Sequence, residues 1–137
     1  MWINEFSVEI NVPKEKIWQL WTDVENWKKW DNSVEYSKIS GKFENGTHGI
    51  LKPVNAPKST FCLKDVVVNT SFTSQSKLPF CTIDFIHEIV NENNCVKIKH
   101  CVKIRGALTF IFKNVIGKNV AKSLPNAVRK LVEMAKD

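Results

Sequence analysis

The sequence has no apolar run near the about 20 residues that a membrane-spanning helix needs. Its opening residues also lack the continuous apolar core of a signal peptide, because Asn4, Glu5, Ser7 and Glu9 interrupt it. No internal repeat, low-complexity stretch or linker divides the 137 residues. These absences favour a single folded domain over residues 1–137, located in the cytoplasm.

The cysteines have no metal-binding spacing. No two of the four cysteines form a Cys-x-x-Cys pair; they are Cys62, Cys81, Cys95 and Cys101. We therefore expect reduced thiols, and neither a metal nor another cofactor. The Gly-rich phosphate-binding motifs and a recognisable Ser–His–acid framing are also absent, so the sequence carries none of these catalytic signatures.

Lysine and arginine give a net charge of +6, but they are spread along the chain and form no long basic block. A dispersed excess of positive charge favours solubility over nucleic-acid binding. We expect no nucleic-acid partner, no stable membrane insertion, and either a monomer or a homodimer. One alternative stays open, in which an acidic protein partner binds the basic face of one predicted strand, formed by Lys97, Lys99, Lys103 and Arg105.

What the chain does contain is a series of strand patterns bounded by turn residues. Apolar β-prone runs, several of them alternating, predict seven strands, over Phe6–Val12, Val34–Ile39, Thr47–Lys52, Thr60–Val68, Ser71–Lys77, Phe80–Val90 and Cys95–Arg105. Two short helices are predicted after the first strand, over Lys14–Trp21 and Val24–Lys29. Their tryptophans Trp18 and Trp21 are expected in the core. The Asn45-Gly46 pair favours a tight hairpin turn.

The last quarter of the chain, residues 107–136, has apolar residues at helical spacing and predicts a helix about 45 Å long. Gly117 and Pro125 should interrupt this helix, with Ser123 as the cap of a restarted segment. Phe110 and Asn114 lie on one helical stripe, where both can face the interior. Phe110 would then form part of the cavity wall, and Asn114 would offer a polar group to the ligand. The alternative is that Asn114 points to solvent.

Several turn and packing residues carry a resemblance to a known superfamily. They are Ile17-Trp18, Thr22-Asp23, Trp30-Asp31, Val34, Gly41-Lys42-Phe43, Gly46-Thr47, Gly49-Ile50-Leu51 and Gly106-Ala107-Leu108. This pattern resembles the START-like (SRPBCC) superfamily, which includes Bet v 1-like plant proteins, lipid-transfer START domains and the polyketide cyclase/dehydrase family. It is most similar to small bacterial polyketide cyclase/dehydrase-like proteins.

The resemblance implies an α+β helix-grip fold. In that fold a curved antiparallel sheet of six to seven strands wraps around a long C-terminal helix, and two short helices follow strand 1. Proteins of this fold bind very different apolar molecules between the sheet and the helix, and a few are enzymes. The implied partner is therefore a small apolar molecule, lipid or polyketide-like.

Charge predicts how the last two strands pair. If Asn93-Asn94 forms the turn between them, Glu88 lies opposite Lys99 and Asp84 lies opposite Lys103. Opposite charges directly across two strands stabilise a register by about 0.5 kcal/mol per pair. This register is therefore preferred over a slip by two residues.

The same register places His87 directly across from His100 on the apolar face. Two imidazoles on a pocket wall can orient a polar ligand group or act as acid and base, as in a cyclase/dehydrase-like enzyme. The alternative is that they are buried, neutral and hydrogen-bonded. A metal is disfavoured because two protein ligands are too few for a tetrahedral site.

We therefore predict a cavity between the sheet and the C-terminal helix that binds a small hydrophobic molecule. Tryptophans where the short helices return to the sheet should grip the ligand at the cavity mouth. The predicted ligand-binding residues are Trp27, Trp30, Phe85, His87, Ile98, His100, Val102, Phe110 and Asn114.

Overall fold

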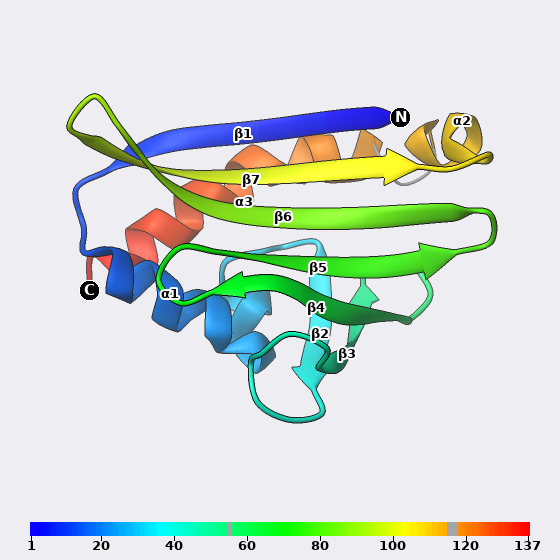
Figure 1. Ribbon diagram of the computed structural model, residues 1–137, viewed down its shortest axis with the longest axis horizontal. Coiled ribbons are helices and arrows are strands. Elements are labelled where there is room, and N and C mark those ends of the chain that lie inside the picture. Colours follow the sequence, from blue (N-terminus) through cyan, green and yellow to red (C-terminus); the bar gives the residue numbers. More distant parts are fainter. Residues whose placement is uncertain (55, 115–117) are drawn as a thin grey trace.

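Seven antiparallel strands form one sheet in the spatial order β1-β7-β6-β5-β4-β3-β2 (Figure 1). A computed structural model describes residues 1–54, 56–114 and 118–137. Its elements are β1 (Trp2–Ile10), α1 (Lys14–Thr22), η1 (Val24–Lys29), β2 (Val34–Ile39), β3 (His48–Pro53), β4 (Ser59–Val67), β5 (Ser71–Leu78), β6 (Cys81–Glu92), β7 (Cys95–Arg105), α2 (Thr109–Phe112) and α3 (Lys118–Ala135). The predicted helix-grip architecture is confirmed.

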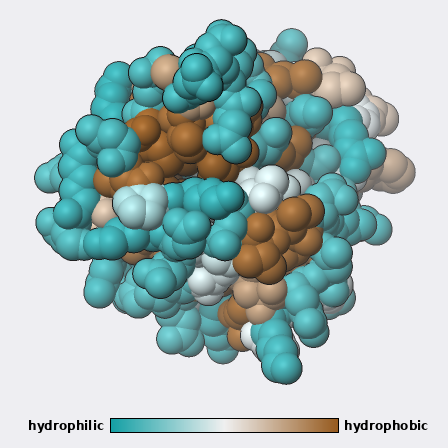
Figure 2. Space-filling model, turned by 60° about the vertical axis from the view of Figure 1, so that its left-hand side comes forward, coloured by the Kyte–Doolittle hydropathy of each residue, from teal (hydrophilic) through white to brown (hydrophobic). Residues whose placement is uncertain are grey.

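The helices lie on one side of the sheet and at its two ends. In Figure 1 α3 runs behind the sheet, α1 and the C-terminus lie at one end, and α2 and the N-terminus lie at the other. The buried face of α3 consists of Leu124, Ala127, Val128, Leu131 and Ala135. Seen with the α1 end turned forward, the surface is mostly hydrophilic, and its hydrophobic areas are separated by hydrophilic side chains (Figure 2).

The pairing of β6 with β7 follows the predicted register. Asn93 and Asn94 have φ angles of 51° and 66°, which suit a tight two-residue hairpin turn. His87 pairs with His100, and Glu88 pairs with Lys99, as expected. The ion pair of Lys99 is not with the residue directly opposite it on β6. Lys99 Nζ instead lies 3.8 Å from a carboxylate oxygen of Glu5, diagonally across on β1.

The tight turn predicted at Asn45-Gly46 forms, because Thr47 N–H donates to the Glu44 carbonyl at 3.2 Å, but it does not join β2 and β3 directly. The connection between these strands spans residues 40–47 and folds against β4. Gly46 N–H donates to the Leu63 carbonyl at 2.8 Å, and Asn45 Oδ1 accepts from Val66 N–H at 2.8 Å. The turn is therefore part of a longer connection that contacts a third strand.

From Thr109 to Ala135, the described residues of the C-terminal segment are helical, as predicted. α2 covers Thr109–Phe112, Lys113 and Asn114 continue in a π-helical conformation, and α3 covers Lys118–Ala135. The break predicted at Gly117 lies outside the described residues. Pro125 does not restart the helix, because α3 continues through it. Ser123 is therefore no cap, and its hydroxyl donates to the Val120 carbonyl at 3.2 Å.

Gly49 on β3 brings two strands and a side chain into close contact. A Cβ at this position would clash with the Phe61 ring and would lie 2.7 Å from the Lys38 carbonyl oxygen. Phe61 in turn stacks on Trp27, with ring centroids 5.7 Å apart. The bare α-carbon of Gly49 thus lets β4 place an aromatic ring beneath the short helices.

Gly49→Ala should lower the free energy of unfolding by about 3 kcal/mol, since the backbone carbonyl cannot move aside as a flexible side chain would. Gly46→Ala is the control, because Gly46 has a φ of 91° and open space around it. That change should cost only the backbone strain, about 1 kcal/mol. Urea unfolding of both variants tests this, and equal losses would contradict the steric explanation.

Candidate functional site

Five rings from different parts of the chain pack together on the concave face of the sheet. We call Trp21, Trp30, Phe72, His87 and His100 the ring cluster. The His87 and His100 centroids lie 4.5 Å apart, with the ring planes at 71°. Phe72 stacks nearly parallel on His87, with centroids 4.0 Å apart. The two imidazoles are therefore held by packing against aromatic rings.

The strand register explains the sheet side of this cluster. Phe6, His100, His87 and Phe72 occupy one row across β1, β7, β6 and β5. Residues paired directly across antiparallel strands point to the same face, so all four side chains face α3. The row is the place where polar rings interrupt an otherwise apolar wall.

The short helices supply the other side. The Trp21 centroid lies 5.7 Å from that of His87 and 5.8 Å from that of His100. Trp30, at the end of η1, lies 5.8 Å from His100. The helical segment after β1 thus covers the histidine pair with indole rings.

Four nitrogen atoms of the ring cluster are buried without a hydrogen-bond partner among the described residues. They are Trp21 Nε1, Trp30 Nε1, His87 Nδ1 and His100 Nε2. Leaving a buried donor or acceptor unpaired costs about 1–3 kcal/mol per group. Four such atoms in one contacting cluster are uncommon, because nearly all buried polar atoms in proteins are paired.

Burial also keeps the histidines neutral. Desolvation lowers the pKa of His87 to about 3, although hydrogen bonding with the backbone of Phe72 and Phe85 raises it. The pKa of His100 is held well below its ordinary value by desolvation and by the nearby His87. At neutral pH each ring therefore offers one N–H donor and one bare nitrogen acceptor.

Several predicted site residues do come together here. Ile98 and Val102 flank His100 on β7 and are fully buried. Phe85 lies two residues before His87 on the same face of β6, yet it stays partly exposed. It therefore gives the concave face a hydrophobic side chain that a ligand can reach from outside.

The two predicted mouth tryptophans lie in the interior. Trp27 and Trp30 are each 4% exposed. Trp27 Nε1 donates to the Trp21 carbonyl at 2.9 Å, so its polar atom is satisfied within the protein. Trp27 thus packs as a core residue, whereas Trp30 belongs to the ring cluster.

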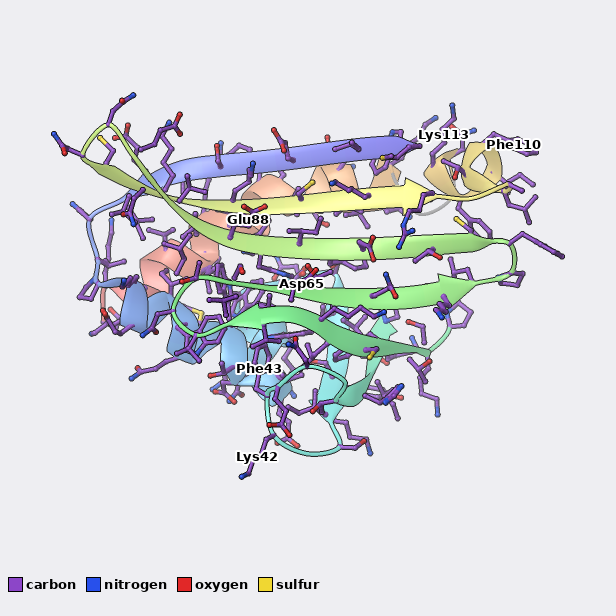
Figure 3. All side chains as sticks on the ribbon, in the orientation of Figure 1. Lys42, Phe43, Asp65, Glu88, Phe110 and Lys113 are labelled. Atoms are coloured by element: carbon purple, nitrogen blue, oxygen red, sulfur yellow. The ribbon has the colours of Figure 1, made fainter. Side chains whose placement is uncertain are left out.

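Phe110 and Asn114 do not join the histidines. Phe110 is 61% exposed, and Asn114 is exposed and donates from Nδ2 to the Phe110 carbonyl at 3.1 Å. Figure 3 shows Phe110 at the end of the molecule, on α2. The predicted stripe therefore faces solvent, because the Asn114 amide bonds the backbone of its own helical turn instead of a group in the interior.

Two open depressions lie at the same end of the molecule. One, of about 530 Å³, is lined by residues including Lys77, Phe80 and Arg105. The other, of about 310 Å³, is lined by residues including Phe110 and Lys113. Neither is lined by a histidine, and the unpartnered imidazole nitrogens His87 Nδ1 and His100 Nε2 are shielded from solvent.

Sequence reasoning missed the role of Trp21. Helical spacing shows that it is buried, and at 0% exposure it is. No sequence signal indicates that its ring covers two histidines more than 65 positions later in the chain. Among the described residues, no group of three or more His, Cys, Asp and Glu side chains comes together as a metal site.

The fold, in contrast, matches many solved structures. A START superfamily protein from Mycobacterium smegmatis superposes with a TM-score of 0.74 at 12% identity, covering 98% of this chain and 97% of that one. Ara h 8.0201 gives 0.71 at 13% identity, with 98% and 97% covered. A norcoclaurine synthase point mutant from Thalictrum flavum gives 0.71 at 14% identity, with 99% and 96% covered.

The chain therefore has the START/Bet v 1-like fold. No family model and no curated protein sequence matches it. At 12–14% identity these likenesses establish the fold and leave the narrower likeness to polyketide cyclases a prediction. Within the described residues, no helix combines the length and apolarity needed to cross a bilayer.

The buried histidines predict how stability depends on pH. Their pKa values are lower in the folded state than the ordinary 6.5, so the unfolded chain binds more protons. Stability should fall as the pH drops below about 6.5 and continue to fall toward pH 3, by up to about 1.4 kcal/mol per pH unit and histidine. Urea unfolding between pH 7.5 and 5 measures this slope.

A double variant isolates the effect. His87→Leu with His100→Leu should flatten the slope, whereas His48→Gln, at an exposed position, should leave it unchanged. Burial raises the pKa of Asp31 against hydrogen bonds from Ser33, but this carboxyl is common to all variants and cancels. Parallel pH profiles for the wild type and the double variant would show that the imidazoles are not the cause.

Two tryptophan substitutions test the unpaired indole. Trp27→Phe removes a hydrogen bond, whereas Trp30→Phe removes an N–H for which the described part of the chain offers no partner. Both exchange an indole for a phenyl ring at 4% exposure, so the packing losses are comparable. Trp27→Phe should therefore cost about 1–2 kcal/mol more in urea unfolding. The reverse order would mean that the Trp30 N–H is satisfied in solution.

Proposed function

We propose that this protein reversibly binds a small, largely hydrophobic molecule between the concave face of the sheet and α3, with the polar group of that molecule at the ring cluster. The observation that carries the proposal is the set of four ring nitrogens without a partner among the described residues, two on the apolar sheet face and two on the helical segment that covers it. A bound polar group can restore the hydrogen bonds that these atoms lack. The free energy that these unpaired atoms cost the free protein is then recovered on binding and adds to the affinity.

The chemistry of the four atoms specifies the polar group. Both indole N–H groups can only donate, so the ligand must accept. A neutral oxygen fits best, since both imidazoles are uncharged and a carboxylate would be buried without a cation. We therefore favour a hydroxyl or carbonyl group on a hydrocarbon body.

The free protein is closed around this site, because the four nitrogens are shielded from solvent. Binding therefore requires the rings of the short helices to move away from those of the sheet. Phe85, which is partly exposed beside His87, offers the hydrocarbon body its first contact on the concave face. The proposal is thus binding by opening, with the hydrogen bonds completed once the ligand is inside.

The structural relatives support a small-molecule role. The norcoclaurine synthase structure holds a transition-state analogue, so a protein with this fold accommodates a small organic molecule. Fold similarity alone does not transfer a reaction, because the same fold serves many functions. The ring cluster of this chain is what makes the proposal specific to it.

Acid–base catalysis by the histidines is less well supported. An efficient general acid or base has a pKa near the working pH, and the pKa of His87 is about 3. Among the described residues, no carboxylate forms an ion pair with either imidazole. Binding uses these neutral rings as they are, whereas a cyclase-like reaction would need them to ionise.

The outer face of the sheet is also a weaker candidate, as an interaction surface. Three of its four basic side chains lie near carboxylates: Lys97 near Glu92, Lys99 near Glu5, and Arg105 near Asp84. The face therefore carries mixed charge and no continuous basic patch. It offers little attraction for an acidic protein.

A matched ligand series tests the proposal. Methyl ketones of increasing chain length should bind about tenfold more tightly than the matching alkanes, which corresponds to one recovered hydrogen bond. The matching carboxylates should bind more weakly than the ketones. Displacement of a fluorescent apolar probe measures all three series, and native mass spectrometry of freshly isolated protein identifies any co-purified molecule.

The histidine variants show whether the preference arises at the ring cluster. His87→Leu with His100→Leu should bring ketone and alkane affinities close together, while the exposed control His48→Gln should keep them apart. Absence of saturable binding across all three series, with nothing co-purified, would refute the proposed function.

A further inference from the structure

The end of the molecule that carries α2 exposes large hydrophobic side chains. Met1, Phe80, Phe110 and Ile111 are 79%, 78%, 61% and 43% exposed. We call these four residues the apolar tip. Two aromatic rings and two aliphatic chains in solvent at one end are a mark of a binding surface, since single exposed hydrophobics are usually scattered.

Backbone contacts hold the parts of the apolar tip side by side. Leu108 N–H, which precedes α2, donates to the Phe80 carbonyl at 3.3 Å. A Cβ at Gly106 would lie 2.5 Å from the same oxygen, so the turn before β6 and the turn after β7 touch. The two depressions described above both include Gly106, and they join Phe80 on one side to Met1 and Phe110 on the other.

Phe80 is held in this position against its conformational preference. Its φ is +55°, a left-handed conformation that is unfavourable for a bulky residue. The turn nevertheless directs the ring into solvent instead of the core. Such an outlier at an exposed aromatic points to a role outside the folded core.

The surroundings of the apolar tip are positively charged. Its depressions are lined by Lys77, Arg105 and Lys113, together with the N-terminal residue, and by no acidic residue. Arg105 pairs with Asp84 at 3.4 Å, but neither Lys77 nor Lys113 forms an ion pair within the described chain. Figure 3 shows Lys113 next to Phe110 at this end.

The positive charge and the hydrophobic side chains of the apolar tip together distinguish among its possible binding partners. A second copy of the chain would bring the same positive charges against each other. A nucleic acid would satisfy the charges, but it offers no apolar phase for Met1 and Ile111. An anionic membrane surface provides negative headgroups and, directly below them, hydrocarbon for exposed rings and aliphatic chains.

We propose that the apolar tip docks reversibly on an anionic lipid surface. In this arrangement Phe80, Phe110 and Ile111 reach the boundary between headgroups and acyl chains. Lys77 and Lys113 contact the anionic headgroups. The docking surface is separate from the ring cluster and places the α2 end of the sheet, rather than the α1 end, against the bilayer.

Vesicle flotation of the full chain tests the proposal. Wild-type protein should float with vesicles that contain phosphatidylserine and should stay behind with pure phosphatidylcholine vesicles, and its binding should weaken as salt is added. Phe80→Ser with Phe110→Ser should lower binding at least about tenfold. Lys113→Glu should weaken binding and reduce its salt dependence.

Matched controls lie elsewhere on the surface. Val67→Ser with Val68→Ser changes two hydrophobic residues that are 53% and 68% exposed at the β4–β5 turn. Lys42→Glu reverses a charge on the loop far from Phe110 in Figure 3. Both controls should float like the wild type, and circular dichroism should show that every variant is folded.

Three results would overturn the inference. The first is that the protein does not bind anionic vesicles. The second is that the tip variants and the control variants lose binding equally. The third is that the tip mediates self-association or binds an oligonucleotide while the protein does not bind vesicles. The outcome is independent of the proposed function, because the tip variants should still bind methyl ketones in solution. Loss of ketone binding with normal flotation would instead count against the ring cluster.

Discussion

The concave face of this protein depends on one constraint, the pairing of β6 with β7. That register sets His87 against His100 and lines them up with Phe72 and Phe6. A shift of β7 by one residue would turn His100 to the outer face, away from His87, and bring the lysines of β7 inside. The packing of indole rings over the pair, the unpaired nitrogens and the low imidazole pKa values all follow from this arrangement.

Much of the fold was predictable because local sequence patterns determine where its strands and short helices begin and end. The bounds expected for β2, β7 and η1 agree with the structure, since turn residues or a helix cap delimit each of them. The hairpin at Asn93-Asn94 was predictable because both residues tolerate positive φ. At Asn45-Gly46 the local preference also produced a tight turn, but contacts with a third strand placed it within a longer connection than a hairpin.

The candidate site was only half predictable. Strand alternation is enough to bring His87 and His100 together, but helical spacing says only that Trp21 is buried and not what it covers. Trp27 and Trp30 have the same exposure, and what separates their roles is the hydrogen bond of Trp27 to the Trp21 carbonyl and the contact of Trp30 with His100. Phe110 was misplaced because helical spacing shows which residues share a stripe but not which way that stripe faces. Such contacts depend on tertiary packing, which sequence spacing does not encode.

The strand order has a consequence for how the chain reaches this structure. β1 lies at one edge of the sheet, and its partner there is β7, which is made after all the other strands. Pairing Trp2 with Ile104 closes a loop of about 100 residues, and such loops carry an entropic penalty. Sheets built from distant pairings fold slowly. β1 therefore stays without its neighbour until β7 has been made, and its docking is a late step of folding.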